Sequence, residues 1–132
     1  IGGIVVGNRL ILSEDGHKRI LEIDLNSYRK SIFKDFSKLP HWLGAITYGE
    51  GKYYISGPQT IYSFSNTTNL VKVAEIPEYN ITGIAVGGNY AYVSVNFGGK
   101  IYKIDLKDGT SSEFVSGLNY PLDLKRGILS QE

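Results

Sequence analysis

Pairs of an aromatic and a polar side chain recur in this sequence, each just after a segment that is predicted to be a β-strand. They are His41-Trp42, Tyr79-Asn80 and Asn119-Tyr120. An aromatic ring beside an amide or imidazole can stack on a sugar or pack on an extended peptide while its polar neighbour forms hydrogen bonds. We therefore interpret these pairs as candidates for ligand binding. The alternative is that the rings pack inside the protein and anchor their loops.

A further pair, Asn96 and Phe97, lies in a loop that ends in two glycines. The predicted ligand-binding residues are His41, Trp42, Tyr79, Asn96, Phe97 and Tyr120. The predicted ligand is a protein or a glycan.

One cluster has side chains of the kind that bind metals, namely Glu14, Asp15 and His17. Because Gly16 lies within it, we interpret this cluster as an exposed polar turn and predict no metal site. The histidines, His17 and His41, have no Ser or Cys partner at a spacing typical of a nucleophile. We accordingly predict no catalytic residue and no cofactor.

Two triplets match the N-glycosylation acceptor pattern, Asn66-Thr67-Thr68 and Asn80-Ile81-Thr82. Both fall in predicted loops, so Asn66 and Asn80 are predicted glycosylation sites. They favour a secreted or cell-surface protein. Chance triplets in a cytoplasmic protein are the alternative, which the sequence leaves open.

Charge and composition narrow the classes of partner. Lys and Arg number 14 against 13 Asp and Glu, so the net charge of +1 gives no electrostatic argument for nucleic acid. No apolar run approaches the roughly 18 residues that a membrane-spanning helix needs, and we expect no membrane insertion. The chain begins with Ile1 and contains no Met, so we expect it to be processed or to be part of a longer protein.

The elements that carry these residues repeat along the chain. The strand-like stretch Lys100 to Leu106 resembles Arg19 to Leu25 and, more weakly, Thr60 to Ser65. Ile20, Ile61 and Ile101 hold the same place in the three copies, at spacings of 41 and 40 residues. Each repeat contains four short apolar runs separated by Gly, Asn and Asp turns. Strands are predicted at 4–6, 10–13, 20–25, 31–36, 45–48, 53–56, 61–65, 70–74, 84–87, 91–95, 101–106 and 112–115.

A period of about 40 residues with four strands per repeat is typical of β-propeller blades. We predict an all-β fold, a β-propeller fragment of four-stranded antiparallel blades. The blades are expected at 1–40, 41–79 and 80–120, with a partial blade at 121–132. The first two strands of each repeat are apolar at nearly every residue, and the fourth strand is the most polar. This gradient predicts that the first strand lies innermost and the fourth outermost.

Equivalent positions in the third strand of each repeat are predicted to be core. They are Leu21, Ile23, Tyr62, Phe64, Tyr102 and Ile104. Three blades leave the faces at both ends of the row uncovered. We expect these faces to carry Ile4, Val6 and Leu10 in the first blade and Ile84, Val86 and Tyr92 in the last. Further blades of the same protein, or a second copy that closes the ring, are the predicted partners.

The repeats resemble the group of β-propellers that includes NHL repeats, YVTN-type surface repeats and gluconolactonase-like enzymes. Three stretches carry the resemblance, Gly83 to Val86, Asn89 to Ser94 and Lys100 to Leu106. The Gly-His and Trp-Asp marks of WD40 blades are missing. The resemblance implies binding of proteins, peptides, sugars or RNA on one face of the ring, where the loops after the second and fourth strands meet.

Some members of this group hydrolyse lactones with a metal held in the channel. Such a metal would need ligands at the starts of several innermost strands, where this chain has Gly3, Gly44 and Gly83. We therefore predict a non-catalytic binding or scaffold module. The alternative is part of a lactonase-like propeller enzyme whose catalytic ligands lie in blades outside this chain.

Overall fold

The computed structural model describes residues 2–14, 17–95 and 99–117. Within them the chain forms twelve β-strands and no helix, and so no helix that could cross a membrane. The strands are β1 (Gly3–Val6), β2 (Arg9–Glu14), β3 (Arg19–Asp24), β4 (Lys30–Asp35), β5 (Ile46–Gly49), β6 (Lys52–Ser56), β7 (Thr60–Phe64), β8 (Val71–Glu75), β9 (Ile81–Gly87), β10 (Tyr90–Val95), β11 (Lys100–Asp105) and β12 (Ser111–Val115). Each lies where a strand was predicted, although β9 begins three residues earlier than expected.

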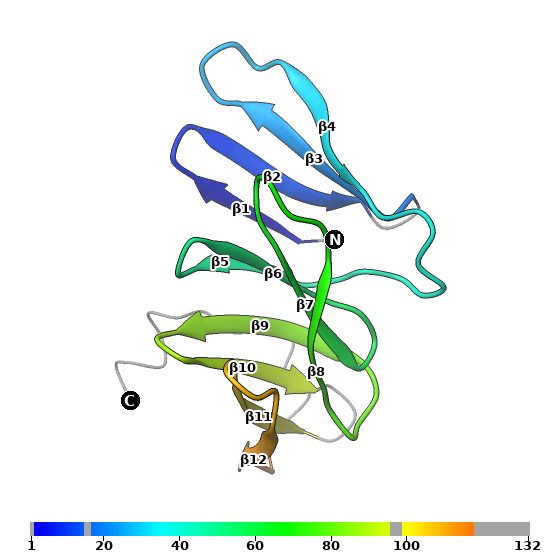
Figure 1. The fold of residues 1–132 in the computed structure, drawn as a ribbon, viewed down its shortest axis with the longest axis vertical. Coiled ribbons are helices and arrows are strands. Elements are labelled where there is room, and N and C mark those ends of the chain that lie inside the picture. Colours follow the sequence, from blue (N-terminus) through cyan, green and yellow to red (C-terminus); the bar gives the residue numbers. More distant parts are fainter. Residues whose placement is uncertain (1, 15–16, 96–98, 118–132) are drawn as a thin grey trace.

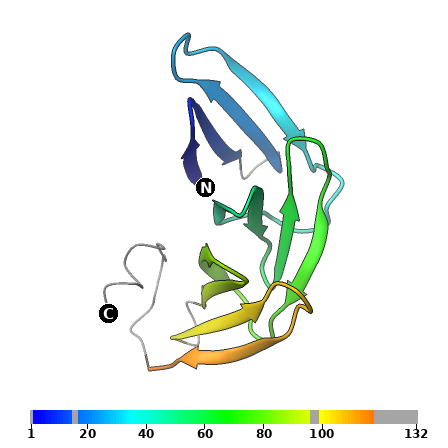
Figure 2. The same cartoon turned by 60° about the vertical axis from the view of Figure 1, so that its left-hand side comes forward.

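The strands form three antiparallel sheets of four strands, each in the order of the sequence. We call them the first blade (β1–β4), the second blade (β5–β8) and the third blade (β9–β12). Strand β5 contacts β1 on one side and β9 on the other, so the innermost strands of successive blades lie together. Figures 1 and 2 show the blades fanning out in an arc, with the outer strands on its convex side. The predicted all-β architecture of blades of about 40 residues is confirmed.

Two-residue turns join the first two strands of each blade and fix which residues face each other. The turns hold Gly7, Gly51 and Gly88 at φ of 58°, 78° and 62°, a backbone conformation that favours glycine. In the first blade Val6 therefore pairs with Arg9 and Val5 with Leu10. The turn geometry thus decides which face each side chain occupies.

A buried serine is the last or next-to-last residue of the second strand of each blade. Ser13, Ser56 and Ser94 are all almost inaccessible to solvent. The Ser13 hydroxyl accepts a hydrogen bond from the Gly2 N–H at 3.0 Å and donates one to the Gly44 carbonyl at 3.0 Å. Because Gly44 leads into the second blade, this hydroxyl joins two blades where their innermost strands begin.

Two apolar clusters fill the spaces between blades. The cluster between the first and second blades contains Ile11, Ile20, Phe36, Leu43, Ile46, Tyr53, Ile55 and Phe64. The cluster between the second and third contains Tyr54, Ile61, Ala74, Ile76, Ile81, Ile84, Val86, Ala91, Val93, Val95, Tyr102 and Ile104. Of the predicted core positions, Phe64, Tyr102 and Ile104 are buried, whereas Leu21, Ile23 and Tyr62 are half-buried. The core therefore lies between sheets, as in a stack.

The prediction missed a second buried position in the third strand of each blade. Ile20, Ile61 and Ile101 are buried on the opposite face from the predicted core residues. Beside each of them the pairing with the outermost strand shifts by one residue, which is a β-bulge. In the second and third blades, the third strand therefore has buried side chains on both of its faces.

The prediction of the uncovered faces was wrong for four residues. Ile4 and Val6 pack on the cluster between the first and second blades, and Ile84 and Val86 are buried between the second and third. The turn register is the reason, since Leu10 shares its face with Val5 and not with Val6. The uncovered face of the first blade instead carries Val5, Leu10, Leu12, Leu21 and Ile23, and Val5 is 63% exposed.

Candidate functional site

Loops from successive blades meet along one edge of the row of sheets. Because each blade is antiparallel, the loops after its second and fourth strands lie at the same edge. We call this edge the loop rim. The described residues on it include 36–45, which join the first blade to the second, and 76–80, which join the second to the third. The loop rim is where ligand binding was predicted.

Two aromatic side chains on the loop rim are open to solvent. Trp42 is 37% exposed and Tyr79 is 56% exposed. Each follows a proline by two residues, Pro40 and Pro77, so they hold equivalent places one blade apart. Their rings can therefore contact a ligand that spans two blades.

Glycine lets the Trp42 ring lie close to the start of the second blade. A Cβ atom at Gly44 would lie 3.0 Å from a ring carbon of Trp42, closer than side chains normally approach. The indole thus has a supporting surface beneath it, which limits its freedom and lowers the entropy lost on binding.

His41 is an anchor for the loop that carries Trp42. Its ring stacks on Tyr62 at a centroid distance of 5.8 Å, and Nε2 lies 2.8 Å from the Tyr62 hydroxyl. Its Nδ1 lies 3.1 Å from the Trp42 carbonyl, which can only accept, so Nδ1 carries the proton. In the neutral ring Nε2 then accepts from the Tyr62 hydroxyl. This geometry favours the loop-anchor interpretation for His41.

Glu78 has the same role in the next loop. It follows Pro77 as His41 follows Pro40, and its carboxylate accepts a hydrogen bond from the hydroxyl of Tyr102, the counterpart of Tyr62. The ammonium of Lys100 lies 2.8 Å from the same carboxylate. In both loops, therefore, the residue after the proline bonds to a tyrosine of the following blade, and the residue after that is the exposed aromatic.

The charges at Glu78 reinforce this anchor. Hydrogen bonds from Lys100 and Tyr102 lower the pKa of Glu78, so it stays ionised at neutral pH. Burial, together with the bond to Glu78, raises the pKa of Tyr102 to about 12, so its hydroxyl keeps the proton that it donates. The hydrogen bond to Glu78 likewise raises the pKa of Lys100.

The remaining predicted site residues have mixed surroundings. Asn96, Phe97 and Tyr120 lie outside the described residues. Asn80 is half-buried with φ of 74°, and its backbone N–H donates to the Pro58 carbonyl at 2.9 Å. Asn66 is exposed in the loop before β8. Its use as a glycosylation site, like that of Asn80, stays a prediction.

The acidic turn near residue 14 shows an ion pair. Glu14 lies 2.6 Å from the Arg19 guanidinium, His17 is exposed, and Asp15 is outside the described residues. Within residues 2–14, 17–95 and 99–117, no three His, Asp or Glu side chains are placed to hold a metal ion.

Sequence reasoning missed Glu78, Tyr62 and Tyr102 as residues that shape the rim. The available signal was the repeated order of proline, polar residue and aromatic in the two loops. It was hidden because one residue separates Trp42 from Gly44, whereas three separate Tyr79 from Gly83.

Comparisons with known proteins agree with this architecture. Streptogramin B lyase matches with a TM-score of 0.76 and 19% sequence identity, over 94% of this chain and 43% of the lyase. The fold is that of a β-propeller. The computationally designed Ika8 protein matches with a TM-score of 0.66 and 12% identity, over 93% of this chain and 38% of that chain. The designed Ika4 protein matches with a TM-score of 0.67 and 12% identity, over 93% of this chain and 76% of that chain.

This chain thus spans less than half the length of the first two proteins. At identities below 20%, the similarity shows the fold alone. No protein-family model and no curated protein matches the sequence.

Proposed function

We propose that the chain is a non-catalytic binding module of a β-propeller, in a secreted or cell-surface protein, that recognises a protein or glycan on its loop rim. One observation carries this proposal. Trp42 and Tyr79 present exposed rings at equivalent positions of neighbouring blades, at the same edge. Aromatic rings supply large contact areas at low entropic cost, and they dominate many binding surfaces.

The anchors beneath these rings support the same function. His41 holds the backbone of Trp42, and Glu78, the residue before Tyr79, accepts a hydrogen bond from the Tyr102 hydroxyl. Loops fixed in this way lose little freedom when a ligand binds. A ligand that touches both rings would lie across the boundary between two blades.

We also propose that further blades of the same protein, or a second copy, cover the open face of the first blade. That face carries Val5 and the half-buried side chains of Leu10, Leu12, Leu21 and Ile23. Apolar sheet faces of this kind are normally buried. In the two boundaries that the chain itself contains, the equivalent faces pack against a neighbouring blade.

A second candidate function is catalytic, as part of a lactonase-like hydrolase whose ligands lie in blades outside this chain. Streptogramin B lyase has a similar fold and is an enzyme, and this supports the catalytic candidate. Elemental analysis of the complete protein distinguishes the binding module from the enzyme. Bound calcium or zinc in the channel would support the enzyme.

The sole tryptophan makes the proposed binding surface directly observable. Fluorescence of Trp42 is recorded during titration with chitohexaose, cellohexaose and the tryptic peptides of serum albumin. We expect a saturable change with at least one probe. Calorimetry on Trp42→Ala and Tyr79→Ala should show affinity for that probe reduced about tenfold, the loss of one aromatic contact.

A matched control is an exposed aromatic at the opposite edge. Tyr28 is 78% exposed in the turn between β3 and β4, and its φ of 60° suits asparagine. Tyr28→Asn should leave the affinity unchanged. The proposal is rejected if no probe changes the fluorescence, or if the rim variants and Tyr28→Asn behave alike.

A further inference from the structure

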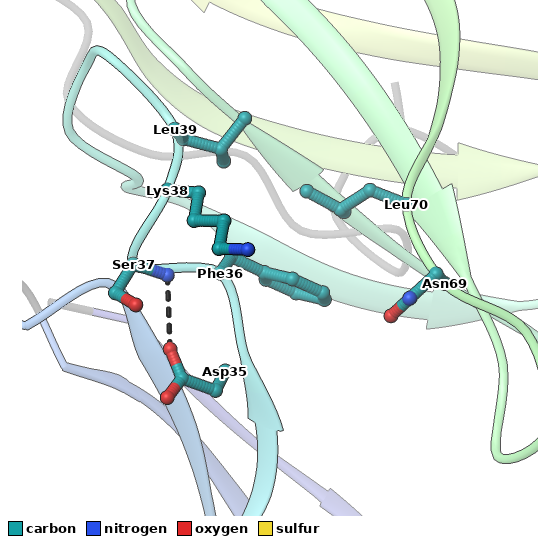
Figure 3. Close-up of a pocket in the computed structure, with 7 residues that line it drawn as sticks. All are labelled: Asp35, Phe36, Ser37, Lys38, Leu39, Asn69 and Leu70. Atoms are coloured by element: carbon teal, nitrogen blue, oxygen red, sulfur yellow. Dashed lines mark hydrogen bonds between the residues drawn. The ribbon is translucent and has the colours of Figure 1, made fainter.

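An open pocket lies between the outer strands of the first two blades, beside the first part of the loop that carries Trp42. It has a volume of about 580 Å³ and is formed where β4 ends and β8 begins (Figure 3). Its lining residues are Asp35, Phe36, Ser37, Lys38, Leu39, Asn69 and Leu70. None of the predicted ligand-binding residues lines it.

The floor of this pocket is apolar and belongs to the core. Phe36 is 7% exposed and meets the Phe64 ring edge-on, with the centroids 5.4 Å apart. Leu39 and Leu70 are half-buried and pack on the same cluster. An aliphatic side chain placed here would remove apolar surface from water. Because Phe36 is almost inaccessible to solvent, the floor exposes little ring surface for a sugar to stack on.

The mouth of the pocket is polar and carries both signs of charge. The ammonium of Lys38 lies beside the apolar floor (Figure 3). Within the described part of the chain, no carboxylate forms an ion pair with it. The carboxylate of Asp35 accepts a hydrogen bond from the Ser37 N–H at 2.9 Å. The hydroxyl and N–H of Ser37 lower the pKa of Asp35, which is therefore ionised. Asn69 adds an amide at the opposite wall (Figure 3).

Both walls are held in place. The Lys34 ammonium donates to the carbonyls of Thr68 at 3.2 Å and Asn66 at 3.5 Å, which ties the loop before β8 to β4. Lys18 donates to the Leu39 carbonyl from the other side. The pocket is thus formed before any ligand arrives, which favours binding.

We propose that this pocket binds an extended peptide in which a large aliphatic residue is followed by an acidic one. The aliphatic side chain enters above Phe36, Leu39 and Leu70. The acidic side chain pairs with Lys38, while Asp35 and Asn69 bond to the peptide backbone, which offers both donors and acceptors. A charge of each sign beside an apolar floor suits a peptide better than a glycan or a nucleic acid.

The test uses the 132-residue chain, labelled with ¹⁵N, and two hexapeptides as probes. One is Gly-Gly-Leu-Asp-Gly-Gly and the other is Gly-Gly-Leu-Lys-Gly-Gly, both blocked at their ends. We expect the first to shift the amide signals of Lys38, Asn69 and Leu70. Its affinity should exceed that of the second about fivefold, the upper range for one exposed ion pair. In Lys38→Glu the order of the two peptides should reverse.

The matched control is Lys30→Glu, a charge reversal at an exposed residue at the start of β4, the end of that strand farther from Lys38, and it should keep the original preference. A Gly-Gly-Ala-Asp-Gly-Gly peptide should bind less tightly, because it leaves the floor exposed. The proposal is overturned by equal affinities of the Leu-Asp and Leu-Lys peptides, by shifts elsewhere in the chain, or by an unchanged preference in Lys38→Glu. Chitohexaose shifting the same signals, with no effect of Lys38→Glu, would assign the pocket to a glycan instead. Since the rim titration reports Trp42, either proposal can fail alone.

Discussion

Truncation of one isoleucine tests whether the core lies between blades. Ile104 is completely buried and sits opposite Ala91, on the face of the third blade that meets the second. Ile104→Ala removes three carbon atoms, worth about 2.4 kcal/mol at roughly 0.8 kcal/mol each. The cavity adds to this, so the free energy of unfolding should fall by about 2–5 kcal/mol.

Two comparison variants make this result specific. Ile23 holds the same place in the first blade, opposite Leu10, but it is half-buried on the open face. Ile23→Ala should cost only about 1 kcal/mol, since less surface is lost and no closed cavity forms. Lys103→Ala should also cost below about 1 kcal/mol, because it removes a partly exposed ammonium that lies 4.1 Å from the centre of the Tyr90 ring.

Urea titration followed by Trp42 fluorescence and circular dichroism measures all three variants. Equal losses for Ile104→Ala and Lys103→Ala would show that the facing of β11 is wrong. A loss for Ile23→Ala as large as that for Ile104→Ala would mean that the face of the first blade is covered in solution. Repeating the titration at several protein concentrations would then reveal whether a second copy covers it, because stability would rise with concentration.

Two further predictions concern a turn and an anchor. Gly109→Ala should lower the melting temperature more than Gly88→Ala. Both glycines have a left-handed φ (76° and 62°), but only a Cβ atom at Gly109 would meet another blade, 2.5 Å from the Val73 carbonyl oxygen. Equal shifts of the melting temperature would argue against that contact. Since Lys100 lowers the pKa of Glu78 below its ordinary value of 4.5, the anchor should stabilise the fold above that pH and lose its effect as the pH falls through the lowered pKa. Urea titrations from pH 7 to 3 should show the advantage of wild type over Glu78→Gln shrinking, and a constant difference would contradict the assignment.

Local features of the sequence were enough to predict the strands and their grouping. The turns at Gly7, Gly51 and Gly88 demand left-handed backbone, which glycine supplies at no steric cost. The apolar runs between such turns are short enough only for strands. A spacing of about 40 residues then requires units that pack on one another, because a single four-stranded sheet cannot bury both of its faces.

For the candidate site, the sequence showed which loops hold aromatic rings, but it could not separate ligand contacts from anchors. Trp42 and His41 are adjacent, yet one is open to solvent and the other is stacked on Tyr62. That difference depends on a residue 21 positions away in the next blade. The pocket above Phe36 could not be predicted from the sequence for the same reason, because Leu70 lines it only when the first two blades pack together.

The sequence by itself determined the strands, their turns and the repeat, because these depend on backbone preferences and on spacing along the chain. Only the tertiary structure decided which face of each sheet meets its neighbour. A shift of one residue in pairing moves a side chain to the other face, so Val5 is exposed while Ile4 and Val6 are packed. The bulges beside Ile20, Ile61 and Ile101 likewise became visible only in the pairing of the folded strands, because the alternation along the third strand does not mark them.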